Sequence, residues 1–140
     1  MFENILLAID GSDHALHAAH VASSLANAMK SQTLRIVVAY DPIPVHLGDP
    51  YMQEAINARL KETEEIMQEA IQALGTVSAE IRTELIEGNP AEVIIEVAQA
   101  HNSNLIVMGS RGLGKLAGLL LGSTSQKVVS HAPCPVLIVR

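Results

Sequence analysis

Three short and almost entirely apolar runs limit the folds open to this chain more than any other feature. They are NILLAID (4–10), LRIVVAY (34–40) and NLIVMG (104–109), and PVLIVR (135–140) closes the chain as a further strand. Strands that are apolar on both faces are typical of a parallel sheet covered by helices on each side. The segment VSAEIRTELI (77–86) instead alternates apolar and polar residues, which predicts a strand with one wet face near a sheet edge.

Helical patterns fill the gaps between these strands. Residues 12–29 are rich in alanine, and apolar residues recur near helical spacing through 52–74. The Asn-Pro pair at 89–90 predicts an N-cap followed by the first turn of a helix. The S-x-x-Q pattern at 123–126 fits a capping box that starts a helix near residue 124. Strands that alternate with helices predict a doubly wound α/β fold with right-handed crossovers.

Length and composition define the class of protein. A chain of 140 residues, 49% of them hydrophobic, predicts one domain over residues 1–140 with a sizeable core. Cys134 is the single cysteine, so no disulfide can form within the chain, and we expect a reducing, cytoplasmic location. The first residues lack the pattern of a signal peptide, and no apolar run reaches the length of a membrane span. We therefore expect no membrane partner.

The charge distribution argues against one class of partner. The formal net charge of −6 disfavours nucleic acid as a ligand. All fifteen acidic residues lie at or before Glu96, and the charged residues after it are Arg111, Lys115, Lys127 and Arg140. This asymmetry favours an anion site in the last third of the chain, although a chance placement of four charges explains it equally well.

The segment VMGSRGLGKLAGLLLGSTSQKVV (107–129) contains two incomplete phosphate-binding patterns. Residues 109–115 read G-x-x-x-x-G-K, but Leu116 stands where a P-loop needs Ser or Thr to bind magnesium. Residues 112–117 read G-x-G-x-x-A, but a dinucleotide fingerprint needs an acid about 20 residues further on. No acid follows Glu96, so both interpretations fail on a missing side chain.

A third spacing in the same segment makes better physical sense. Gly109 and Gly112 are followed by nine residues and then by Gly122 and Ser123. Glycines allow the main chain to turn sharply and to approach a ligand closely. The N–H groups of residues 123–125, at the start of a helix, have no helical partner and can hold phosphate oxygens with help from the helix dipole.

This spacing, G-x-x-G, nine residues, G-S, resembles the nucleotide-binding branch of the universal stress protein family. The resemblance extends over the whole chain through NILLAIDGSDHA, EGNPAEVIIEVA, NLIVMGSRGLG and HAPCPVLIV. It implies a three-layer α/β/α sandwich of the adenine nucleotide alpha hydrolase-like type, with a five-stranded parallel sheet in the order 3-2-1-4-5. That order reverses between strands 1 and 4, and ligands bind at such switch points.

The resemblance also implies the residues of a site for ATP or another adenine nucleotide. Asp10 would contact the ribose, or the phosphates through ATP-bound Mg, although a turn with Gly11 would also explain its position. The main chain at Ala39 would face adenine, and Met108 and Arg111 would lie beside the phosphates. The full set of implied nucleotide-binding residues is Ala8, Ile9, Asp10, Ala39, Met108, Gly109, Arg111, Gly112, Gly122, Ser123, Thr124 and Ser125.

The last strand predicts a partner. In the order 3-2-1-4-5 it lies at an edge, yet Val136, Leu137, Ile138 and Val139 include no charge to protect that edge from aggregation. A two-fold axis would pair the strand with its own mate in antiparallel register. The resemblance implies the same homodimer, with the ATP sites outside the interface, and leaves a higher oligomer open.

Three histidines near the N-terminus have two explanations. His14, His17 and His20 are spaced three residues apart, so the first and last lie about 120° apart around a helix. No acid or cysteine completes a set of metal ligands, and we expect a solvated helix face. Cys134, between two prolines, is expected to be a buried and unreactive thiol.

The combined expectation is a cytoplasmic, ATP-binding regulatory protein of the stress response that acts as a homodimer. A slow ATPase or a self-phosphorylating enzyme on the same fold is the alternative. Arg111 or Lys115 could neutralise developing charge, but no residue is a credible group for positioning water. A dimerisation module without nucleotide is a second alternative, and the intact glycines argue against it.

Overall fold

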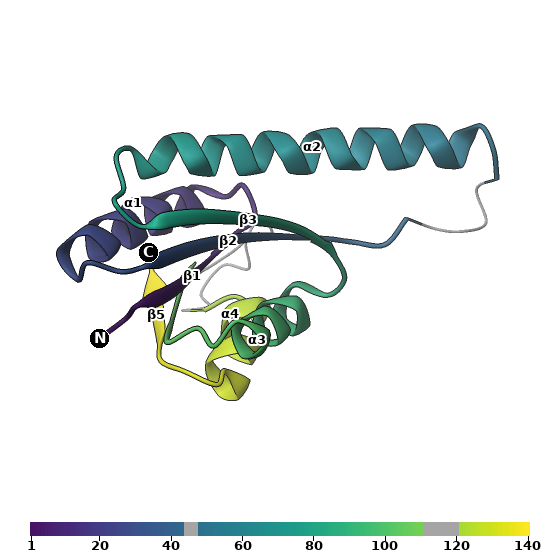
Figure 1. Cartoon of the computed structure of the whole chain (residues 1–140). Coiled ribbons are helices and arrows are strands. Elements are labelled where there is room, and N and C mark those ends of the chain that lie inside the picture. Colours follow the sequence, from purple (N-terminus) through teal and green to yellow (C-terminus); the bar gives the residue numbers. More distant parts are fainter. Residues whose placement is uncertain (44–47, 111–120) are drawn as a thin grey trace.

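The structure is a computed structural model that describes residues 1–43, 48–110 and 121–140. In these residues strands and helices alternate along the chain (Figure 1). The elements are β1 (Asn4–Ile9), α1 (Asp13–Ala28), β2 (Thr33–Tyr40), α2 (Tyr51–Leu74), β3 (Glu80–Glu87), α3 (Pro90–Ala100), β4 (Leu105–Gly109), α4 (Ser123–His131) and β5 (Val136–Val139).

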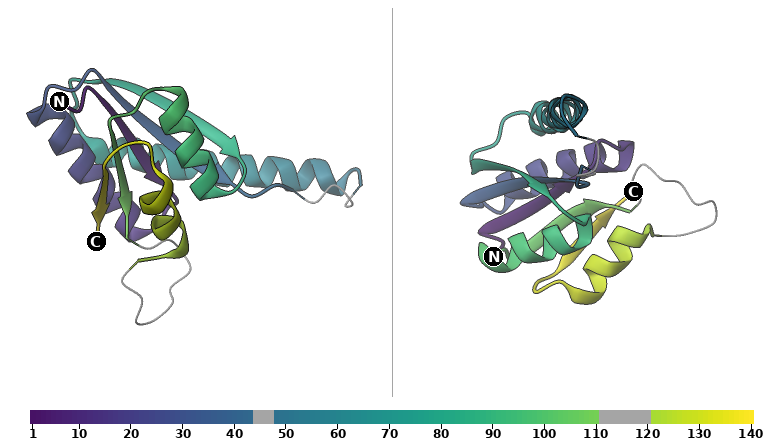
Figure 2. Two further views of the ribbon diagram at one scale, coloured as in Figure 1. Left: turned by 90° about the horizontal axis from the view of Figure 1, so that it is seen from below. Right: turned by 90° about the vertical axis from the view of Figure 1, so that its right-hand side faces the viewer.

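The strands form one parallel sheet in the order β3-β2-β1-β4-β5. Helices α1 and α2 lie on one face of this sheet, and α3 and α4 lie on the other (Figure 2). Helix α2 extends well beyond the sheet at its N-terminal half (Figure 1). The three-layer α/β/α architecture and the strand order implied by the family resemblance are confirmed.

The core explains why the strands are apolar on both faces. Successive residues of β1 point in opposite directions, so Ile5 and Leu7 join the core cluster under α1 and α2, whereas Leu6 and Ala8 join the cluster under α3 and α4. Leu6 is 0% exposed. Replacing it with alanine would cost about 2–5 kcal/mol of stability, because a cavity would remain.

The two edges of the sheet differ in charge. The edge strand β3 includes charged residues at Glu80, Arg82, Glu84 and Glu87, which protect an edge from pairing with other chains. The predicted position of this alternating strand at an edge is confirmed. It begins at Glu80 rather than at residue 77, because its neighbour β2 begins at Thr33, the partner of Glu80 in the register.

The helix starts follow the sequence in two cases and differ in a third. Ser12 caps α1 and Asn89 caps α3 through their side-chain oxygens, as expected for these residue types. The capping box predicted at Ser123 is wrong, since the N-cap residue of α4 is Gly122 and no side chain caps this helix. Gln126 donates instead to the main-chain oxygen of Leu121 at 3.1 Å.

Candidate functional site

The strand order places the ends of β1 and β4 side by side. Ala8 pairs with Met108 in this ladder, so Asp10 and Ser110 both lie just past the ends of adjacent strands. The chain then enters α1 on one face of the sheet and approaches α4 on the other. We call the ends of β1 and β4, with the first turns of α1 and α4, the switch point, because strand order reverses here and open α/β sheets bind ligands at such positions.

Asp10 combines a turn with an available carboxylate oxygen. Its Oδ1 accepts a hydrogen bond from the Ser12 main-chain N–H at 2.9 Å, so the turn suggested by the sequence is present. Gly11 has a φ of +85°, which favours glycine. Within the described residues, the second carboxylate oxygen of Asp10 has no protein partner, and this oxygen could accept a ribose hydroxyl or contact a metal ion.

Gly109 is required by the packing of α1. A Cβ atom at this position would lie 2.9 Å from the Cβ of His14 and 3.0 Å from the main-chain nitrogen of Ala15. The sequence suggested that this glycine allows a sharp turn and close approach to a ligand. The structure gives a further reason, since the first turn of α1 lies directly against the end of β4.

Ser110 connects the elements that meet at the switch point. Its N–H donates to the Val139 oxygen of β5 at 2.7 Å, and its own oxygen accepts the Gly122 N–H at 2.7 Å. Its hydroxyl lies 2.7 Å from Nδ1 of His14 in α1. Ser110 is 1% exposed, so these bonds form in a nearly dry environment where hydrogen bonds strengthen and unmet ones are costly.

The first turn of α4 has donors available for an anion. The first helical hydrogen bond runs from the Gln126 N–H to the Gly122 oxygen. In the part of the chain that is described, the N–H groups of Ser123, Thr124 and Ser125 have no main-chain or side-chain acceptor. Such groups, together with the helix dipole, form an anion site at a helix N-terminus.

The hydroxyl of Ser125 has a structural role. It donates to the Gly109 oxygen at 2.9 Å and lies 3.2 Å from the Ser110 oxygen, and Ser125 is buried. The Ser125 hydroxyl therefore holds the end of β4, and only the main-chain N–H of this residue is available to an anion. Ser123 is exposed and Thr124 half-buried, so their hydroxyls remain accessible.

The remaining predicted residues have mixed outcomes. Ala8, Ile9 and Met108 are buried and form the floor of the switch point. Ala39 lies one residue beyond Val38, the last residue of β2 that pairs with β1, and it pairs with Ile86 of β3 on its other side. Arg111 and Gly112, by contrast, lie outside the described residues.

His14 is a functional candidate that sequence reasoning missed. In the sequence it is one of three histidines spaced three residues apart, and in the structure its ring contacts the Ser110 hydroxyl. Its position two residues after the helix cap at Ser12 was the available signal, because this places it in the first turn of α1. The ring of His17 lies 2.5 Å from the Arg140 oxygen, and His20 is exposed.

Two further features bear on chemistry. Among the described residues, no group of three His, Cys, Asp or Glu side chains could hold a metal ion. Burial raises the pKa of the Cys134 thiol, which lowers its thiolate fraction and its reactivity at neutral pH. The cysteine is half-buried rather than buried as expected, and its raised pKa agrees with an unreactive thiol.

Comparison with known proteins decides the family. Residues 1–140 match the model of the universal stress protein family. The chain belongs to the universal stress protein family. It is 49% identical over 140 residues to a universal stress protein encoded in the QAH/OAS sulfhydrylase 3′ region of Thermus aquaticus, and the match covers 100% of both chains.

Solved structures of the family share the fold. The universal stress protein UspA from Lactobacillus plantarum superposes with a TM-score of 0.86 at 31% identity, over 99% of this chain and 98% of that one. A universal stress protein solved in complex with cAMP has a TM-score of 0.66 at 28% identity, over 97% and 95%. In the described residues, no helix is both long and apolar enough to cross a bilayer.

Proposed function

We propose that this chain is a cytosolic, ATP-binding regulatory protein that acts as a homodimer in the stress response. Residues 1–140 would act as one universal stress protein domain. Nucleotide occupancy would change a surface or the affinity for a partner, and turnover would be slow or absent. The observation that carries the proposal is the convergence of Asp10, the end of β4 and the open first turn of α4 at one switch point.

The proposed nucleotide pose follows from these groups. The N–H groups of residues 123–125 would hold phosphate oxygens. The available oxygen of Asp10 would accept a ribose hydroxyl or contact the phosphates through ATP-bound Mg. The main chain of Ala39, beyond the last pair with β1, would face adenine and select it over other bases. The cAMP bound by a family member with the same fold supports adenine nucleotides as the ligand class.

The chain's own residues fit a nucleotide with its Mg better than a resident metal. The described residues include no cluster of three metal-ligating side chains. A single carboxylate beside main-chain donors instead suits a metal that arrives already bound to phosphates. Mg would supply charge neutralisation on the phosphates, while Asp10, already fixed by the Ser12 N–H, would orient the ribose or hold the phosphate-bound Mg.

The proposed homodimer uses β5. This strand pairs with β4 on one side and lies at the end of the sheet on the other. Its residues Val136, Leu137 and Ile138 are half-buried and carry no charge. A second copy in antiparallel register would satisfy the free main-chain groups of the strand.

A retention experiment tests the nucleotide proposal. The protein is incubated with equal concentrations of ATP, GTP, CTP and UTP, desalted and denatured, and the released nucleotide is identified by mass. We expect adenine nucleotide alone. Retention of all four nucleotides alike, or of a nucleotide without adenine, would contradict the site. Phosphate release from ATP above about 1 per second, in the range of ordinary enzymes, would contradict a regulatory role.

A further inference from the structure

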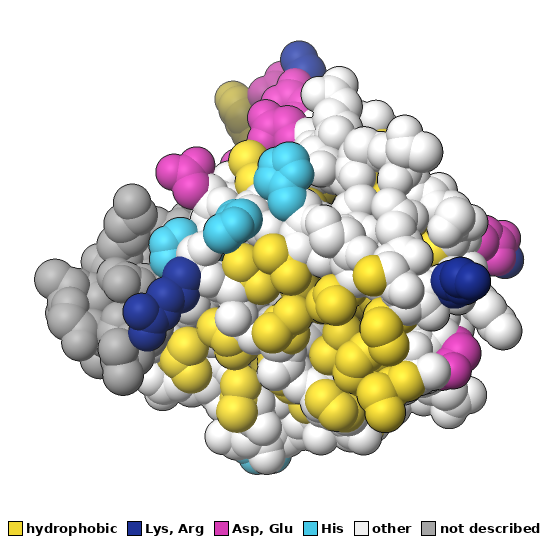
Figure 3. Space-filling view, turned by 90° about the vertical axis from the view of Figure 1, so that its left-hand side faces the viewer, with side chains coloured by type: hydrophobic (Ala, Val, Ile, Leu, Met, Phe, Trp, Pro, Cys, Tyr) yellow, Lys and Arg dark blue, Asp and Glu magenta, His cyan; other side chains and the backbone are white. Residues whose placement is uncertain are grey.

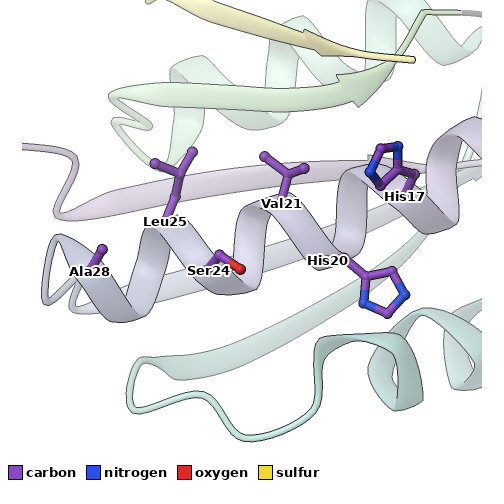
Figure 4. Close-up of a pocket in the computed structure, with 6 residues that line it drawn as sticks. All are labelled: His17, His20, Val21, Ser24, Leu25 and Ala28. Atoms are coloured by element: carbon purple, nitrogen blue, oxygen red, sulfur yellow. The ribbon is translucent and has the colours of Figure 1, made fainter.

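Helix α1 has a second, partly exposed apolar face beside the row of alanines that packs on the sheet. Its alanines, such as Ala18 and Ala22, are 0% exposed and pack on the strands. On another side of the helix, residues of the described chain line a groove of about 460 Å³ (Figure 4). These lining residues, which we call the α1 groove, are His17, His20, Val21, Ser24, Leu25 and Ala28.

The α1 groove continues into the β5 edge. Val21 and Leu25 point from α1 toward the edge of the sheet where β5 lies (Figure 4). Both pack against the same core cluster as Leu137 of β5, and His17 contacts the Arg140 main-chain oxygen just after β5. A space-filling view of this side shows one broad apolar surface with histidines along its border (Figure 3).

The size of β5 shows that a dimer needs more than strand pairing. The strand has only four residues, Val136–Val139. A stable protein interface buries roughly 800 Å² on each partner and uses about 20–30 residues a side. Pairing of two such strands therefore requires additional buried surface, and the α1 groove is apolar surface that adjoins the strand.

Symmetry places this surface at the same interface. Two antiparallel strands in one sheet are related by a two-fold axis perpendicular to the sheet. Each helix layer of one copy then lies on the same face of the joined sheet as the matching layer of the other copy. The two α1 helices therefore lie on one face, and the two β5 strands with their side chains lie between them. Val21 and Leu25 of each copy would face the axis.

Charge favours a second copy as the occupant. The protein has a formal net charge of −6, so two copies repel each other over most approaches. The α1 groove is lined by no Asp, Glu, Lys or Arg. The outer face of α2, by contrast, includes Glu64, Glu65 and Glu69, and would place like charges together.

We infer that the α1 groove is covered by a second copy of this chain, and that Val21 and Leu25 add to β5 the buried area that holds the dimer. This inference rests on the proposed homodimer at β5. It goes beyond that proposal by assigning much of the interface to a helix face that the strand-pairing argument does not include.

Charge substitution tests the inference. Leu25→Asp is compared with Leu60→Asp, a matched change at a leucine of α2 that is 36% exposed and lies away from β5. The dimer dissociation constant is measured by analytical ultracentrifugation, and folding by circular dichroism. We expect Leu25→Asp to weaken dimerisation at least 100-fold and Leu60→Asp to leave it unchanged. A folded Leu25→Asp variant that dimerises like the parent overturns the inference.

Cysteine labelling provides a measurement that does not disturb packing. Leu25 is half-buried, so its Asp variant can fail to fold, whereas Ser24 is exposed. In a Cys134→Ser background, Ser24→Cys is labelled with a maleimide, and Gln68→Cys on α2 is the control. In the Ser24→Cys variant, we expect the labelling rate to be at least tenfold lower than in the same variant that also carries Leu137→Asp. The labelling rate of Gln68→Cys should be the same with and without Leu137→Asp. Equal rates at position 24 overturn the inference.

The outcomes separate the inference from the proposal on which it rests. A dimeric parent that Leu137→Asp dissociates, with position 24 equally reactive in both states, removes the α1 groove from the interface and leaves the β5 dimer in place. A parent that is monomeric at micromolar concentration overturns both.

Discussion

At the switch point, polar main-chain and hydroxyl groups converge, whereas the neighbouring β5 edge presents almost only apolar side chains. The switch point contains Asp10, the Ser110 hydrogen bonds and the open N–H groups of α4. The β5 edge presents Leu137 and Ile138, with the apolar residues of the α1 groove beside them. The first surface suits a small anion, and the second suits another protein surface.

Under the proposed function, this chemical difference would separate nucleotide binding from dimerisation within one small chain. Ser110 joins the two surfaces, because its N–H donates to the Val139 oxygen while its carbonyl accepts from Gly122. Because the two surfaces differ in chemistry, a variant on one should leave the function of the other almost unchanged.

Leu137→Asp should have the largest effect. Each dimer would bury two unpaired carboxylates, at a cost of several kcal/mol for each. We expect dimerisation to weaken by at least about 1,000-fold, which corresponds to about 4 kcal/mol, with ATP affinity unchanged. Light scattering gives the mass and calorimetry the affinity. A variant that stays dimeric at micromolar concentration, or that loses ATP binding as well, would remove the separation.

Gly122→Val should give the reverse result. Gly122 has φ −71° and ψ 166°, a conformation that valine adopts readily, so the fold should persist. The new side chain would stand at the N-cap of α4, where phosphate would approach. We expect ATP affinity to fall at least about 100-fold, or about 2.7 kcal/mol, while the dimer is retained. Unchanged calorimetric affinity in the folded dimer would refute the assignment of this turn.

Asp10→Asn separates the two roles of Asp10. The amide oxygen of asparagine can still accept the Ser12 N–H and so maintain the turn, but the negative charge is lost. A hydrogen bond to a charged group contributes about 1.5–3 kcal/mol, so we expect ATP affinity to fall by about 10- to 100-fold with little change in melting temperature. If the variant binds ATP like the parent, Asp10 is only a turn residue.

Ser125→Ala should have the smallest effect on binding and a visible effect on stability. Its hydroxyl satisfies the buried Gly109 and Ser110 oxygens, so its removal should cost about 1–3 kcal/mol of unfolding free energy. The main-chain N–H that would hold phosphate is unchanged, and ATP affinity should fall less than tenfold. Ser130→Ala in the same helix, an exposed site, is the control. Chemical denaturation and calorimetry measure both quantities.

Much of the fold could be predicted because burial restricts composition. Strands covered on both faces, such as β1 and β4, need apolar residues throughout, and the alternation in β3 indicated an edge with a wet face. The family resemblance supplied the strand order. The residues of the switch point, including Asp10 and Gly109, followed from their positions at strand ends.

The details that failed depend on contacts between distant residues. The capping box at Ser123 is a local pattern, but tertiary contacts begin the helix differently, because the Gly122 N–H donates to the Ser110 oxygen and the Ser125 hydroxyl donates to the Gly109 oxygen of β4. The contact between His14 and Ser110 joins residues 96 positions apart, and no local pattern encodes it. The ligand and the dimer stay predictions until they are measured.

Titration of the parent protein with ATP and Mg in a calorimeter tests the adenine nucleotide site at the switch point. The switch point, with its open helix N-terminus and fixed carboxylate, predicts one ATP per chain with a dissociation constant below about 100 μM, or about −5.5 kcal/mol. GTP at the same concentrations should bind at least tenfold more weakly. The absence of binding by ATP at millimolar concentration, or equal affinity for GTP, would contradict an adenine nucleotide site at the switch point.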